Sequence, residues 1–120
     1  MEESTRKCLY VAVWTPADLD VFIPHQANLR IIGAVGERLA LTADKVYVNI
    51  DRYGNTSSAS IPIALDELVR SGRLHKGSKV AFAAFGGGAT WGGATMTWTL
   101  PAYVDEEAAI AAPLAKGAVA

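Results

Sequence analysis

The sequence predicts an α/β fold in which a mostly parallel sheet is covered by helices. Short runs of β-branched and aromatic residues, which are typical of strands, alternate with segments whose apolar residues recur every three or four positions, which is typical of amphipathic helices. A helix between two strands implies a right-handed crossover, and such crossovers join parallel strands. The 120 residues suffice for one compact domain, and 51% of them are hydrophobic. This share is high for a small domain, so we expect part of the surface to face a partner.

The first predicted strand and helix lie before residue 40. Residues 15–18 indicate a turn or a helix start with Pro16 at its first position. Residues 21–23 are expected to form a brief buried strand that ends at Pro24. The period of the apolar residues then changes, which predicts an amphipathic helix after Asn28. Its apolar positions are Leu29, Ile32, Val35 and Leu39.

A second strand and a second helix follow. β-branched and aromatic residues at positions 46–50 predict the strand. Gly72 is expected to close the helix, and Pro62 requires regular helical hydrogen bonding to start close to it. The candidate N-caps are Ser57, Ser58 and Ser60, and the apolar face carries Ile61, Leu65 and Leu68. Asp66 and Glu67 are expected on the exposed face, where they need no special role.

The last predicted elements are two strands, at residues 79–85 and 94–100, on either side of three glycines at 86–88. The stretch from residue 80 to residue 100 contains no charged side chain, which is also a property of membrane-spanning helices. Five glycines and four threonines interrupt this stretch and favour two strands around a tight loop. We therefore expect no membrane span.

Charge and cysteine content exclude several classes of function. The chain has 11 lysine and arginine residues against 12 aspartate and glutamate residues, a formal net charge of -1. A nearly neutral chain lacks the field that gathers nucleic acid or an anionic membrane surface. Cys8 is the single cysteine, so an internal disulfide is excluded, and no thiol spacing indicates a zinc site. We expect a cytoplasmic protein without nucleic-acid or membrane partners.

Two polar segments each follow a predicted strand and open a predicted helix. They read PHQAN at residues 24–28 and YGNTS at residues 53–57. The carboxyl ends of parallel strands meet at one edge of a sheet, where active sites of such folds lie. His25 and Asn55 are therefore expected to converge, although 30 positions (55 − 25) separate them.

The segments VFIPHQANLRI, DRYGNTSSASIP and AFGGGATWGGA resemble the three signature segments of the β-ketoacyl-ACP synthase III family, in the same order and at matching intervals. This resemblance implies a thiolase-like half-domain, the C-terminal half of a fold that a pseudo-symmetric N-terminal half normally completes. It implies a family domain at residues 18–100, preceded by an atypical segment at 1–17. The alanine-rich tail at 101–120 is expected to be poorly ordered.

The resemblance also implies acyltransferase chemistry. Synthases of this family take an acyl group from acyl-CoA onto a cysteine, decarboxylate malonyl-ACP and join the two, which starts fatty-acid or polyketide chains. His25 and Asn55 correspond to the donors that hold the malonyl thioester oxygen. Gly87 corresponds to a backbone N–H at the second oxyanion, and Arg30, extended by Arg38, to a docking patch for acyl carrier protein and CoA. The resemblance implies a homodimer that needs no metal or bound cofactor, with CoA and carrier-protein thioesters as substrates.

The family's nucleophilic cysteine has no counterpart in the chain. Cys8 lies only 17 positions before His25 (25 − 8), and no small-residue helix start that would lower its pKa accompanies it. Two interpretations stay open. In one, the chain supplies the His/Asn part of the site and another N-terminal half, on the same or a separate chain, supplies the nucleophile. In the other, it is a non-catalytic remnant that docks carrier protein or dimerises.

Overall fold

The computed structural model describes residues 1–105. Its helices and strands, in chain order, are α1 (Glu2–Val11), β1 (Val21–Pro24), α2 (Leu29–Arg38), α3 (Ile50–Tyr53), α4 (Ser60–Arg70), β2 (Lys79–Gly86) and β3 (Thr90–Thr97). Short 3-10 turns lie at Pro16–Asp18, Ala43–Lys45 and Ser57–Ala59. Most of the predicted alanine-rich tail, residues 106–120, lies outside the described residues. In the described part of the chain, no helix has the length and apolar character needed to cross a bilayer.

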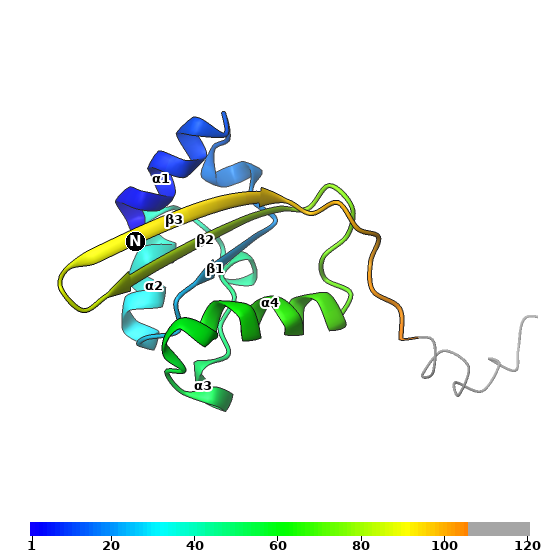
Figure 1. Cartoon of the computed structure of the whole chain (residues 1–120). Coiled ribbons are helices and arrows are strands. Elements are labelled where there is room, and N and C mark those ends of the chain that lie inside the picture. The colour runs from blue at the N-terminus through cyan, green and yellow to red at the C-terminus, as the bar shows by residue number, and fades with distance from the viewer. Residues whose placement is uncertain (106–120) are drawn as a thin grey trace, which may run out of the picture.

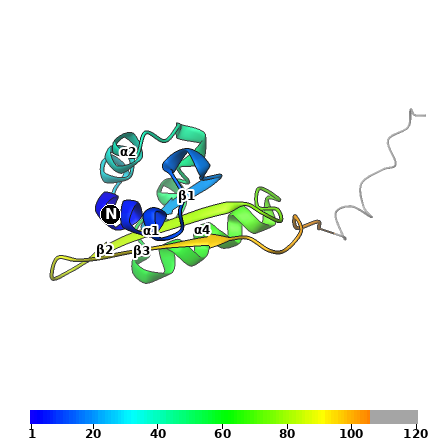
Figure 2. The same cartoon turned by 90° about the horizontal axis from the view of Figure 1, so that it is seen from above.

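The helices cover both faces of one sheet, which confirms the α/β class. Figure 2 shows α1 and α2 on one side of the sheet and α4 on the other. The order of the strands is β1-β2-β3, so that β2 lies in the middle and β3 forms an edge (Figure 1). The sheet thus presents the carboxyl end of β1 beside the carboxyl end of β2, as the site prediction requires.

The sheet is mixed, which corrects the expectation of a mostly parallel one. β1 and β2 are parallel and in register from Val21 opposite Val80. β2 and β3 are antiparallel and pair over eight positions. The reason is the short glycine loop, since a connection of a few residues can only return the chain antiparallel. The prediction of two strands around this loop is confirmed, although β3 begins at Thr90, earlier than expected.

Alternation along β1 divides the core into two clusters. Phe22 points toward α1 and α2, whereas Val21 and Ile23 point toward α4, because successive side chains of a strand face opposite ways. The first cluster contains Leu9, Leu19, Phe22, Val35, Leu39, Ala81 and Ala83. The second contains Val21, Ile23, Ala64, Leu68, Leu74 and Val80. Burial on both faces explains why β1 reads as an unbroken apolar run.

The two long predicted helices are present, but they begin differently. In α2 the side chain of Asn28 accepts a hydrogen bond from the backbone N–H of Arg30, which is an ordinary N-cap. In α4 the N-cap is Ala59, and no side chain caps the helix. The expected serine cap is therefore wrong. Ser60 is instead the first residue of α4, and its hydroxyl bonds elsewhere.

The predicted strand at residues 46–50 is also wrong. Val46 forms only an isolated bridge with Phe22, and the backbone N–H of Tyr47 donates to the carbonyl of Phe22. At Asn49 the backbone N–H donates to the side chain of Gln26, and α3 then starts at Ile50. A side chain thus takes the place of a neighbouring strand, which overrides the β propensity of these residues.

Candidate functional site

An open cavity of about 960 Å³ lies at the carboxyl ends of β1 and β2. Its wall combines these strand ends with the start of α4, the loop after α3 and the start of β3. The lining residues include His25, Asn55, Ser60, Phe85, Gly87 and Trp91. His25 and Asn55, which the sequence places 30 positions apart (55 − 25), thus face one space.

His25 is held on three sides. Its backbone N–H donates to the carbonyl of Ala83 at 2.7 Å, which extends the parallel ladder by one residue. Its ring meets Phe85 edge-on, with centroids 6.0 Å apart and an interplanar angle of 66°. The Nδ1 atom lies 2.6 Å from the hydroxyl oxygen of Ser60. The imidazole therefore has a fixed position at the end of β1.

Asn55 is positioned by the backbone around it. Gly54 has φ 67° and ψ −160°, a conformation that is essentially restricted to glycine. The Oδ1 atom of Asn55 then accepts a hydrogen bond from the backbone N–H of Ser57 at 2.9 Å. Since the amide oxygen is engaged, the NH₂ group is the end of the side chain that can donate to a ligand.

Gln26 connects the His25 strand to the segment that leads to Asn55. It is 1% exposed. Its side-chain NH₂ donates to the carbonyls of Pro24 and Tyr47, and its Oε1 accepts from the backbone N–H of Asn49 at 3.0 Å. One buried amide thus satisfies three backbone groups and fixes the spacing between the two polar segments.

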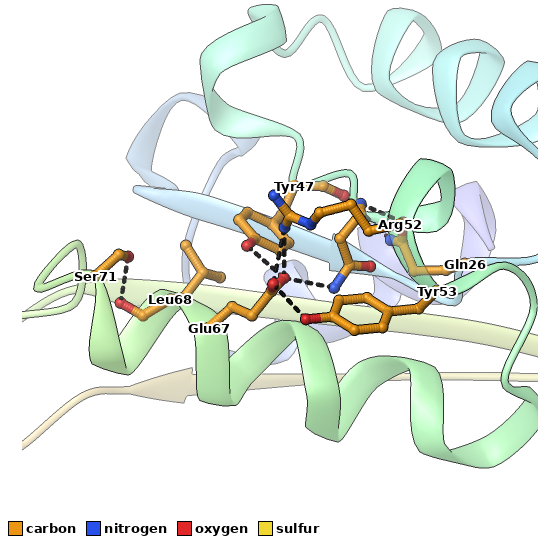
Figure 3. Close-up of polar contacts among 8 residues, drawn as sticks. Gln26, Tyr47, Arg52, Tyr53, Glu67, Leu68 and Ser71 are labelled. Carbon is orange, nitrogen blue, oxygen red and sulfur yellow. Dashed lines mark hydrogen bonds and ion pairs between the residues drawn. The ribbon is translucent and has the colours of Figure 1, made fainter.

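Glu67 of α4 holds the same segment from the other side (Figure 3). Its carboxylate accepts hydrogen bonds from four side chains, which are those of Tyr47, Asn49, Arg52 and Tyr53. The bond from Asn49 Nδ2 is 2.7 Å long, and Arg52 forms an ion pair at 2.8 Å. The expectation that Glu67 has no special role is therefore wrong. Asp66, in contrast, has a side chain that is 60% exposed.

The hydrogen bonds around Glu67 change the pKa of several groups. Burial alone would raise the pKa of the Glu67 carboxyl, but the hydrogen bonds from Asn49, Tyr47, Tyr53 and Arg52 outweigh burial and hold that pKa below its usual value. Burial, and then the hydrogen bond to Glu67, raise the pKa of Tyr47. Both shifts favour an ionised carboxylate beside a neutral phenol.

Acid is expected to destabilise the chain through Glu67. Because folding lowers the pKa of this carboxyl, its stabilising effect is complete above the ordinary value of 4.5 and is lost as the pH falls through the lower folded value. Urea unfolding between about pH 7 and pH 3 should therefore show a smaller loss of unfolding free energy in a Glu67→Gln variant than in the wild type. Asp66→Asn, one position earlier, is the control, because it removes a carboxylate that pairs with Arg70 and not with the segment at 47–53. Equal pH dependence in all three proteins would contradict this role of Glu67.

The other predicted site residues are more loosely placed. Gly87 lies in the loop after β2 and lines the cavity, but a Cβ there would meet no protein atom within 4 Å. Arg30 lies in the first turn of α2, and Arg38 is the last residue of that helix. Arg38 NH1 lies 3.6 Å from Glu2 Oε2, and its side chain is 73% exposed. The two arginines are thus at opposite ends of α2, eight positions apart (38 − 30).

In the described residues, the cavity contains neither the thiol of Cys8 nor a cluster of metal-binding side chains. Cys8 is a half-buried free thiol on α1 and does not line the cavity. In residues 1–105, no group of three or more histidine, cysteine, aspartate or glutamate side chains could hold a metal ion. The cavity lining offers the side chains of His25 and Asn55, serine hydroxyls and the aromatic rings of Phe85 and Trp91.

Sequence reasoning missed Gln26, Ser60 and Glu67. Gln26 could have been identified, since it directly follows His25 in the PHQAN segment. The sequence indicates Glu67 more weakly, because this residue is three positions after Ala64 and so borders the buried side of α4. Ser60 could not be told from Ser57 and Ser58 as a candidate cap.

The family model described as "3-Oxoacyl-[acyl-carrier-protein (ACP)] synthase III C terminal" matches residues 9–98. The β-ketoacyl-[acyl-carrier-protein] synthase III of Clostridioides difficile (strain 630) is 52% identical over 100 residues, which are 83% of this chain and 30% of that protein. The synthase III of Xanthomonas euvesicatoria pv. vesicatoria (strain 85-10) is 59% identical over 81 residues, which are 68% of this chain and 25% of that protein.

Solved structures agree with the fold. The β-ketoacyl-[acyl carrier protein] synthase III of Thermus thermophilus matches with a TM-score of 0.79 at 52% identity, over 82% of this chain and 30% of that one. The priming β-ketosynthase of the R1128 polyketide biosynthetic pathway matches with a TM-score of 0.78 at 40% identity, over 83% of this chain and 30% of that one.

The fold is that of a thiolase-like half-domain. The chain belongs to the β-ketoacyl-ACP synthase III family and corresponds to its C-terminal domain. It spans 30% of the length of the Clostridioides difficile synthase and 25% of the length of the Xanthomonas euvesicatoria synthase.

Proposed function

We propose that this chain supplies the malonyl-binding, decarboxylating part of a β-ketoacyl-ACP synthase III. The complete reaction condenses an acyl thioester from acyl-CoA with malonyl-ACP and starts a fatty-acid or polyketide chain. The observation that carries the proposal is that His25 and Asn55 line one cavity, with the amide oxygen of Asn55 already engaged by Ser57. Both side chains carry N–H groups that can donate a hydrogen bond, and relatives that match over most of the chain are synthases of this family.

The proposed chemistry follows from where charge appears. When the malonyl thioester loses CO2, the electron pair of the broken C–C bond moves into an enolate, and the thioester oxygen becomes negative. Two neutral N–H donors aimed at that oxygen stabilise the enolate without offering it a strong acid. The enolate carbon then attacks the acyl thioester. No bound metal or cofactor takes part in these steps.

The remaining components of the proposal are the nucleophile, the association partners and the docking groups. An N-terminal half, on the same chain or another, brings the nucleophilic cysteine, because Cys8 does not line the cavity. Exposed apolar side chains such as Tyr10, Val11 and Leu29 support association with that half and with a second copy. Carrier protein and CoA dock through Arg30, with the oxyanion at the acyl cysteine held by a backbone N–H near Gly87. A cytoplasmic setting suits the free thiol.

CO2 release from malonyl-ACP by the purified chain tests the proposal. Asn55→Ala and His25→Ala should each lower the rate by about 10²–10³-fold, which is the usual effect of losing one oxyanion donor. His75→Ala is the matched control, because His75 is exposed and lies outside the cavity lining. It should release CO2 at the wild-type rate.

The alternative is a non-catalytic docking or dimerisation module. A chain that is folded by circular dichroism but releases no CO2, alone or mixed with an N-terminal half, would contradict the proposed function and favour this module. A folded chain whose release is unaffected by Asn55→Ala would show that the cavity is not the site.

A further inference from the structure

The hydroxyl of Ser60 is the polar group closest behind the His25 ring. Its oxygen lies 2.6 Å from His25 Nδ1, and Ser60 is only 2% exposed. Because Ser60 is the first residue of α4 and His25 follows the last residue of β1, the contact joins two elements that both border the cavity. The other ring nitrogen, Nε2, is the one left to face a ligand there.

A third group determines the direction of this hydrogen bond. The backbone N–H of Gln26 donates to the same Ser60 oxygen at 3.2 Å. A serine hydroxyl has one hydrogen and two acceptor positions, whereas a neutral imidazole has one N–H and one bare nitrogen. With Gln26 donating to one acceptor position of the oxygen, the hydroxyl hydrogen is available to donate to a bare His25 Nδ1.

The opposite arrangement leaves a donor unpaired. If His25 carried its hydrogen on Nδ1, the Ser60 oxygen would accept two hydrogen bonds, and its own O–H would need a different acceptor. The hydrogen bonds found in residues 1–105 give the Ser60 hydroxyl no partner beyond His25 and Gln26. A buried O–H without an acceptor is unfavourable, so this arrangement has a higher free energy than the first.

We propose that Ser60 is a positioning residue that holds neutral His25 in the tautomer with its hydrogen on Nε2. In this tautomer the N–H faces the cavity and donates to a bound acceptor, whereas in the other tautomer a bare nitrogen would face the same acceptor and repel it. The functional consequence rests on the proposed decarboxylation. The tautomer itself is a property of the chain without substrate.

Nitrogen-15 NMR of the histidine-labelled chain tests the assignment directly. At a pH at which the imidazole ring is neutral, His25 is expected to show a proton-bearing Nε2 and a hydrogen-bonded Nδ1 without a proton. In a Ser60→Ala variant the Nδ1 signal should move to that of a nitrogen without a hydrogen bond. The matched control is Ser71→Ala at the other end of α4, where the serine hydroxyl donates to the carbonyl of Leu68. It should leave the His25 signals unchanged.

Activity gives a second and separable readout. Ser60→Ala should lower kcat for CO2 release by about tenfold and leave KM nearly unchanged, because a hydrogen bond behind the donor is lost while the donor itself remains. A wild-type chain with the hydrogen of His25 on Nδ1 would overturn the proposal, even if CO2 is released. A chain with the hydrogen on Nε2 that releases no CO2 would keep the Ser60 assignment and contradict the proposed function instead.

Discussion

Replacing Gln26 by methionine is expected to lower the free energy of unfolding by about 3 kcal/mol or more, since each buried polar group left without a partner costs about 1–3 kcal/mol. The amide of Gln26 holds the carbonyls of Pro24 and Tyr47 and the backbone N–H of Asn49. Methionine has a similar length and makes none of these bonds. Because the segment at 47–49 leads to Asn55, the rate of CO2 release should decrease together with the free energy of unfolding.

Urea unfolding measures this loss, with Leu68→Met as the matched control. Leu68 is fully buried between α4 and the sheet and has no polar group to lose. Exchanges of this kind usually cost less than about 1.5 kcal/mol. A Gln26→Met protein that is as stable as Leu68→Met would show that the three hydrogen bonds do not stabilise the fold.

Truncating Phe22 to alanine is expected to cost about 3–5 kcal/mol, which is the range for removing a large aromatic side chain from a packed core. Phe22 is 0% exposed and is the member of β1 that packs toward α1 and α2. Its loss leaves a cavity that Leu9, Leu19 and Leu39 border. The penalty is a large part of the 5–15 kcal/mol that stabilises a typical domain, so the variant should be partly unfolded near room temperature.

Tryptophan fluorescence during urea unfolding reports this change, because Trp14 packs against the same cluster. Tyr10→Ala is the control, since that aromatic side chain is 83% exposed, and surface changes usually stay within about 0.5 kcal/mol. If Phe22→Ala and Tyr10→Ala were equally stable, β1 would not be anchored through Phe22.

The parts of the fold that depend on periodicity could be predicted from the sequence. The helix after Asn28 was predicted because its apolar residues recur at helical intervals. Ile32, Val35 and Leu39 are indeed buried, whereas Leu29, the fourth predicted position of that face, is 59% exposed. The glycine loop between two strands was likewise predictable, because glycines at 86–88 separate two strand-like segments. The convergence of His25 and Asn55 followed from placing each after a strand, although residues 46–50 proved not to be one.

The parts that depend on partners distant in sequence could not be predicted. Residues 46–50 have strand-like composition, yet Gln26, 23 positions before Asn49, takes the backbone N–H that a strand neighbour would have bound. Glu67 looks like an ordinary charged helix residue, because its partners come from positions 14 to 20 residues earlier. Periodicity describes which face a residue occupies and carries no information about which side chain meets it.

The position of β3 at the edge of the sheet bears on how the purified chain behaves at high concentration. Its residues are mostly exposed, and its outer backbone N–H and C=O groups face away from β2. Natural proteins usually guard such an edge with a lysine, a proline or a bulge, whereas TWGGATMT contains no charge and no proline. No strand of residues 1–105 pairs with this edge, so two copies are expected to join edge to edge at high concentration. A single Thr→Lys change on β3 should raise the concentration up to which the chain stays monomeric.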